Sequence, residues 1–194
     1  MHVRKWRDKR AVREYAFFEA RKKGGLGEEW TMIYLKTATP LGKMVLASDG
    51  TALAGAWFEG QKYFPSLEGW GNEEEDLLLR KAASELALYF DGRLKHFSLP
   101  MQPSGTAFQK KVWAGIAGVL YGGTLTYGFL AERLATSPRA VGSATGRNPL
   151  SIFIPCHRLV ASDGFITGYA GGLERKRALL ALEGIAVNDD RVTL

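Results

Sequence analysis

The sequence predicts an α+β protein with two domains: a small N-terminal domain with a three-stranded sheet and one helix, and a mainly helical C-terminal domain. Strand-like segments separated by turns fill the first part of the chain, and apolar residues recur at helical spacing in the second. One strand or loop of the second part carries Pro155-Cys156-His157-Arg158. We expect a basic extension at residues 1–30, the N-terminal domain at 31–100 and the C-terminal domain at 101–194.

The composition is that of an ordinary globular protein, with 46% hydrophobic and 24% charged residues among 194. We find no apolar segment long enough to span a membrane and no secretory signal. One cysteine excludes an intramolecular disulfide, and three scattered histidines add no zinc-binding pattern. We expect a cytoplasmic or nucleoid-associated protein without a metal.

The positive charge is concentrated at the N-terminus. Residues 1–24 hold nine Lys or Arg against three acidic residues, which equals the whole net charge of +6. Such an arm can bind nucleic acid electrostatically. It can equally be a solubilising tail or reflect a start codon placed too early.

Three strands are predicted in the N-terminal domain, at residues 31–37, 43–48 and 52–58, because turn residues separate these short apolar segments. A helix should follow, capped by Asn72, with an acidic first turn and an end near Asp91-Gly92. Residues 96–105, which contain two prolines, are the expected linker.

The C-terminal domain is predicted to begin with a helix whose buried face holds Phe108, Val112, Ile116 and Val119, with Trp113 also in the core.

A pair of helices should follow. Thr126 can cap a helix over residues 127–134, and Ser137 can cap another that has Pro138 at its first position. This spacing fits a helix-turn-helix, and a packed helical hairpin has the same spacing.

The second helix of this pair carries small side chains and Arg139. Base-reading helices normally present Arg, Lys, Asn or Gln, so this one favours shape-based docking in a narrow groove, with Arg139 able to intrude. Alternatively, Gly142 and Gly146 serve tight helix packing.

Cys156 is the candidate nucleophile. It follows an apolar run, residues 152–154, with the bulk of a buried strand, and Pro155 ends that run. His157 and Arg158 follow, and nearby cations favour a thiolate. The alternative is a cysteine that only fills space in the core.

The chain resembles the O6-alkylguanine-DNA alkyltransferases, also called methylated-DNA–protein-cysteine methyltransferases, over about residues 33–185. The resemblance rests mainly on Ile154-Pro155-Cys156-His157-Arg158-Leu159 and on Gly168-Tyr169-Ala170-Gly171-Gly172-Leu173. Supporting segments are Lys176…Leu179-Leu180…Glu183, Asn148-Pro149, Arg139–Gly142, Thr126–Gly128, Thr39–Gly42 and Phe58–Phe64.

The resemblance implies that a damaged guanine is flipped out of the duplex and that its O6-alkyl group moves to Cys156. His157 would take the thiol proton through a water, and Glu183 would orient His157. The family would then predict one turnover per molecule, because a thioether offers water no carbonyl to attack. No cofactor and no metal are expected, and the spent protein should be less stable.

The resemblance also implies DNA-binding roles. Tyr127 would crowd the target phosphate and contact the flipped base, Arg139 would enter the vacated stack, and Asn148 would tie the recognition helix to the active-site strand. Ser143 belongs to the same DNA-facing helix. Arg158 would be structural.

Main-chain groups of Cys156, Leu159 and Ala170 would read the guanine edges. Because a damaged base pairs poorly, flipping it is easier than flipping a normal base. The expected partner is double-stranded DNA carrying O6-alkylguanine, with no membrane, and the protein is expected to be a monomer. O4-alkylthymine is a further candidate substrate.

Three other classes of protein are alternatives. A non-catalytic alkyltransferase-like lesion-binding protein would have tryptophan in place of Cys156. A helix-turn-helix regulator would need base-reading side chains after Pro138. A cysteine hydrolase would turn over and would need an oxyanion hole.

Overall fold

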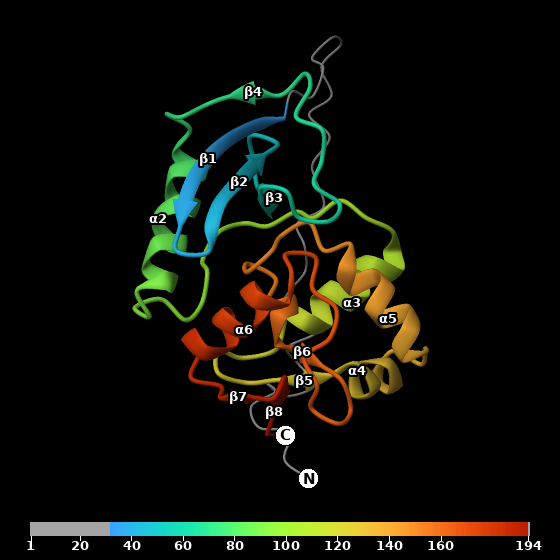
Figure 1. The fold of residues 1–194 in the computed structure, drawn as a ribbon. Coiled ribbons are helices and arrows are strands. Elements are labelled where there is room, and N and C mark those ends of the chain that lie inside the picture. Colours follow the sequence, from blue (N-terminus) through green and yellow to red (C-terminus); the bar gives the residue numbers. More distant parts are fainter. Residues whose placement is uncertain (1–31, 194) are drawn as a thin grey trace.

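The computed structural model describes residues 32–193, which form an N-terminal sheet domain beside a mainly helical C-terminal domain (Figure 1). The predicted fold class is confirmed. The three predicted strands are present as β1 (Ile33–Thr39), β2 (Gly42–Ser48) and β3 (Leu53–Phe58), joined as an antiparallel meander. Thr31, which we placed in the first strand, lies outside the described residues, as does the basic arm.

The sheet has a fourth strand that the sequence did not predict. β4 (Gly71–Asn72) pairs in parallel with the start of β1, so that the strand order is β3-β2-β1-β4. Only two residues long, it leaves no alternation pattern to recognise.

The predicted cap of the first helix is wrong. Helix α2 (Leu77–Phe90) is capped by Asp76, whose carboxylate accepts a 2.8 Å hydrogen bond from the Leu79 amide. Asn72 is held in β4 by its pairing with Tyr34, so it lies too far upstream to serve. The end of the helix at Asp91 agrees with the prediction.

The C-terminal domain begins with α3 (Ala107–Ala117), whose N-terminus is capped by a capping box between Thr106 and Gln109. Trp113 is buried, as predicted, and its Nε1 donates to the Ala144 carbonyl at 2.9 Å. Phe108 was predicted in the core but is 37% exposed, because it lies in the first turn before the helix meets its neighbours. Val119 is buried beyond the end of the helix.

The predicted helix pair is present as α4 (Tyr127–Arg133) and α5 (Pro138–Gly146), capped by Thr126 and Ser137 as expected. α5 also packs on α3, as Figure 1 shows. The remaining elements are β5 (Leu125–Thr126), the 3-10 turn η1 (Cys156–Arg158), β6 (Leu159–Val160), α6 (Leu173–Leu182), β7 (Val187–Asn188) and β8 (Arg191–Val192).

The strand predicted at residues 152–154 is wrong. These residues form a buried turn, bridged between Ser151 and Ile154, with Ile152 at a φ of +73°. A β-branched residue rarely adopts this conformation. Burial alone produced the apolar run, and a buried turn gives the same signal as a buried strand.

The N-terminal sheet supports the segment that carries Cys156. The outer edge of β3 exchanges hydrogen bonds with the chain after α5: Ala56 N donates to Pro149 O at 2.8 Å, and Ser151 N donates to Ala56 O at 2.9 Å. Leu53 similarly binds Pro100 and Gln102 of the expected linker. One hydrophobic core runs through both halves. Within residues 32–193, no helix is long and apolar enough to cross a membrane.

Removing the true helix cap should destabilise the protein measurably. We expect Asp76→Ala to lower the free energy of unfolding by about 1 kcal/mol, because an amide of the first turn of α2 loses its acceptor. Urea denaturation measures this, with Asn72→Ala as the control that should change little. A larger loss from Asn72→Ala would contradict this assignment.

Candidate active site around Cys156

Cys156 is held at the start of η1 by the side chain of Asn148. The Asn148 Nδ2 donates to the Cys156 Sγ at 3.1 Å and to the Ile154 carbonyl at 2.9 Å, while its Oδ1 accepts from the Leu150 amide. One amide therefore fixes the buried turn and the sulfur together, directly after α5 ends.

The Cys156 thiol is protonated at rest. Burial raises its pKa, against the opposing effects of the Asn148 hydrogen bond and the nearby Lys176 charge. A nucleophilic role consequently requires a partner that removes the proton as the reaction proceeds.

His157 and Glu183, 26 positions apart, lie next to each other in the interior. His157 Nε2 is 2.9 Å from Glu183 Oε1. Arg158 binds the same carboxylate in a bidentate manner, with Nε donating to Oε2 and an Nη donating to Oε1, both at 2.8 Å. The Glu183 carboxylate is therefore buried together with an opposite charge that hydrogen-bonds to it, which is the condition for burying a charge at tolerable cost.

Two further donors complete the Glu183 site. The Tyr89 hydroxyl, from α2 of the N-terminal domain, donates to Oε1 at 2.8 Å, and the Gly122 amide donates to Oε2 at 3.2 Å. A side chain at Gly122 would lie 3.1 Å from the Glu183 carbonyl oxygen, and its φ is +70°, so glycine is required on both counts.

These contacts set the protonation states. Burial lowers the pKa of His157 below its ordinary value despite the carboxylate beside it, which leaves the imidazole neutral near pH 7. Although burial works against it, His157 and Arg158 hold the pKa of Glu183 well below its usual range. With Nε2 facing the carboxylate, Nδ1 has no hydrogen-bond partner within residues 32–193 and is the nitrogen able to accept a proton.

Lys176 is a residue that our sequence reasoning left without a role. It is fully buried on α6, and its Nζ donates to the carbonyls of Leu159 at 2.5 Å and Thr167 at 2.7 Å. Burial lowers its pKa to about 8. It thus joins the start of β6 to the following loop, near enough to the thiol for its charge to act on it. Among 26 basic residues, nothing in its local sequence marked it as buried.

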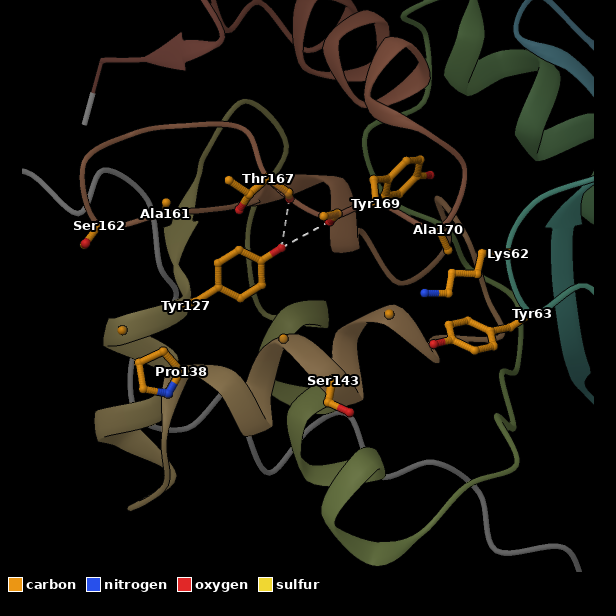
Figure 2. A pocket seen from close by; sticks show the side chains of 14 residues that line it. Lys62, Tyr63, Tyr127, Pro138, Ser143, Ala161, Ser162, Thr167, Tyr169 and Ala170 are labelled. Carbon is orange, nitrogen blue, oxygen red and sulfur yellow. Dashed lines mark hydrogen bonds between the residues drawn. The ribbon is translucent and has the colours of Figure 1, made fainter.

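A cavity of about 680 Å³ opens between α5 and residues 161–170 (Figure 2). Tyr127 stands across it and donates to the carbonyls of Thr167 and Gly168, both at 3.2 Å. Ser143 and Ala170 also line it.

The small residues of α5 keep this cavity open. Gly142 and Gly146 both line it, and a Cβ at either position would meet nothing within 4 Å. Tight helix packing, the alternative explanation for these glycines, is therefore excluded.

The structure thus gathers the predicted residues into two adjoining groups. Asn148, Cys156, His157 and Glu183 belong to the buried cluster, and Leu159 is buried beside it with its carbonyl on Lys176. Tyr127, Ser143 and Ala170 line the cavity, whereas Arg139 is exposed on the first turn of α5 and lines neither. Within residues 32–193, no group of three His, Cys, Asp or Glu could hold a metal ion.

Comparison with known proteins gives two matching family models. The 6-O-methylguanine DNA methyltransferase ribonuclease-like domain matches residues 32–103, and the DNA binding domain of the same family matches residues 107–185.

Curated relatives and solved structures agree with these models. The methylated-DNA–protein-cysteine methyltransferase of Haemophilus influenzae is 40% identical over 161 residues, covering 81% of this chain and 89% of that protein. The Methanosarcina acetivorans protein of the same name is 41% identical, covering 79% and 99%. The crystal structure of Mycobacterium tuberculosis OGT in complex with DNA superposes with a TM-score of 0.75 at 38% identity, covering 78% of this chain and 93% of that one.

Removing the charge of Glu183 should destabilise the fold strongly. In Glu183→Gln the Arg158 guanidinium loses its buried counter-ion, so we expect a loss of about 3–5 kcal/mol in unfolding free energy at pH 7. Glu59→Gln, which breaks a surface pair with Lys36, is the matched control and should lose less than about 1 kcal/mol.

The stability lost in Glu183→Gln should depend on pH. Because folding lowers the pKa of Glu183 from 4.5, its contribution is present above that value and is lost as the pH falls below it. The stability gap between wild type and Glu183→Gln should therefore narrow in acid. A gap that is constant from pH 7 to pH 3 would contradict the buried ion pair.

Proposed function

The chain belongs to the family of 6-O-methylguanine DNA methyltransferases, and we propose that Cys156 is the residue to which it transfers the alkyl group. It is an enzyme of DNA repair by direct alkyl transfer, and DNA is its partner. The observation that carries the assignment of Cys156 is its setting: Asn148 holds the buried sulfur, and the next residue in the chain is a buried histidine that a carboxylate orients.

The proposed chemistry follows from His157 and Glu183 in the buried cluster. His157 Nδ1 takes the thiol proton through a water, while Glu183 holds the ring by Nε2 and stabilises the imidazolium that forms. The sulfur attacks the alkyl carbon, the carbon–O6 bond breaks, and its electron pair stays on the guanine, which is reprotonated from solvent or the imidazolium. The Asn148 hydrogen bond and the Lys176 charge stabilise the developing thiolate.

The reaction should stop after one transfer. The product is a thioether at a saturated carbon, which water does not hydrolyse under the conditions that cleave an acyl-cysteine. The added group also enters a closely packed site, where overpacking is destabilising.

DNA is proposed to meet the face of α5. Its small residues allow close approach in a narrow groove, with Ser143 on the cavity side and Arg139 free to enter the base stack. Tyr127 at the cavity contacts the flipped base, and Asn148 couples α5 to the sulfur. The Leu159 carbonyl retains a second lone pair beyond its Lys176 bond, so it and the main chain of Ala170 can read the guanine edge.

The remaining proposals concern organisation and location. We propose a monomer of the cytoplasm, divided into an extension at residues 1–30 and domains at 31–100 and 101–194. The non-catalytic lesion-binding alternative is disfavoured because Cys156 occupies the acceptor position.

Stoichiometric methylation tests this function directly. Wild-type protein mixed with a duplex carrying one O6-methylguanine should gain the mass of one methyl group, mapped to Cys156, at no more than one per molecule. Cys156→Ala should gain none. Tight lesion binding without any mass change would instead support the non-catalytic alternative.

The rate of transfer should report on His157. Since burial lowers its pKa from 6.5, the single-turnover rate should stay level near pH 7 and fall, by about tenfold per pH unit, only in the acid range below 6.5. Stopped-flow or quench measurements across pH 5–9 provide the profile. A rate that climbs tenfold per unit from pH 7 to 9 would show that spontaneous thiol ionisation, rather than His157, limits the reaction.

A further inference from the structure

The loop after β3 brings one exposed cation to the end of the cavity, although it belongs to the N-terminal domain, and a second exposed cation directly follows α5. Lys62 and Tyr63 line the cavity together with Ser143 and Gly146 of α5. In Figure 2 their side chains extend toward the space above α5, at the end of the cavity away from Pro138.

This loop is built rigidly. The Gln61 side chain is buried, and its Oε1 accepts from the Phe58 amide at 3.0 Å and from the Ser151 hydroxyl at 3.3 Å. The Lys62 amide donates to the Ala170 carbonyl at 3.1 Å. The loop is thus fastened to the chain before Cys156 and to the cavity wall.

Tyr63 has a φ of +63°, which is unusual for a residue with a bulky side chain. Its side chain is 48% exposed, so burial of the ring in the core does not explain this backbone conformation. Such strain persists only where the surroundings enforce it and is concentrated at functional sites.

The Tyr63 ring holds the two cations. The Lys62 Nζ lies 5.0 Å from the ring centroid, and the guanidinium carbon of Arg147, the residue directly after α5, lies 4.8 Å from it. All three side chains are exposed, and within residues 32–193 neither cation forms an ion pair. Two like charges on one ring repel each other, so the arrangement favours an anion between or above them.

We propose that Lys62, Tyr63 and Arg147 form a binding site for a backbone phosphate of the DNA, supplied jointly by both domains. This inference rests on the proposed function and adds the N-terminal domain to the DNA interface. α5, with nine residues, is about 13 Å long, and the minor groove is about 6 Å wide. A helix lying across that groove extends past its edge, so the residues at its C-terminal end reach the phosphates.

The site is tested by the salt dependence of DNA binding. Wild type, Lys62→Gln and Arg147→Gln are titrated by fluorescence anisotropy with a labelled, unmodified duplex at several KCl concentrations. Each variant should reduce the slope of log affinity against log salt by about 0.9. The affinity ratio of wild type to variant should therefore be about eight times larger at 0.1 M KCl than at 1 M KCl. The double variant should lose no more slope than either single variant, because the three side chains serve one phosphate.

Two controls separate this site from other causes. Lys81→Gln removes the same charge from the exposed face of α2 and should bind like wild type. The free energy of unfolding in urea should be unchanged in Lys62→Gln and Arg147→Gln, because both side chains are exposed and, within residues 32–193, neither forms an ion pair.

Three results would overturn the proposal: an unaltered salt slope in both variants, an equal change in Lys81→Gln, or a parallel loss of unfolding free energy in Lys62→Gln and Arg147→Gln, which would indicate a structural role for the loop. If the proposed function itself failed, wild type would take no alkyl group from the O6-methylguanine duplex, whatever the salt slopes show.

Discussion

The buried carboxylate of Glu183 is the interaction on which the rest of this structure depends. It accepts hydrogen bonds from Arg158, from the Tyr89 hydroxyl and from the Gly122 amide, and it orients His157. Because a carboxylate in the interior is tolerated only when its lone pairs are satisfied, these donors must be in place together. They come from both domains, so His157, the proposed base, is positioned only when the two halves are packed.

The N-terminal domain therefore contributes more than support. Its α2 provides Tyr89 to the buried cluster, and the outer edge of β3 holds the segment between α5 and Cys156 through Ala56. The loop after β3 then reaches the cavity wall at Ala170. A strained turn at Ile152 is tolerated because the sheet on one side and Asn148 on the other fix its ends.

The chemistry of the cluster follows from burial balanced by specific contacts. Burial raises the pKa of the Cys156 thiol and lowers the pKa of His157, which favours the uncharged form of both groups. In the proposed reaction the thiolate is needed only transiently, and the Asn148 hydrogen bond and the Lys176 charge that would stabilise it are already in place. Under that proposal, such preorganisation would let a buried thiol react without being ionised at rest.

The sequence by itself determined the fold class and the caps at Thr126 and Ser137, and it singled out Cys156 as the candidate nucleophile, because periodicity, capping and motif chemistry are local. Tertiary structure decided what depends on contacts between distant residues. Only the resemblance had linked His157 with Glu183, and nothing local indicated that the Tyr89 hydroxyl and the Lys176 ammonium are buried, since a buried polar side chain is identified by partners distant in the chain. The apolar run at 152–154 was misread for the same reason: burial leaves a signal in the sequence, whereas the direction in which a buried segment turns is set by its neighbours.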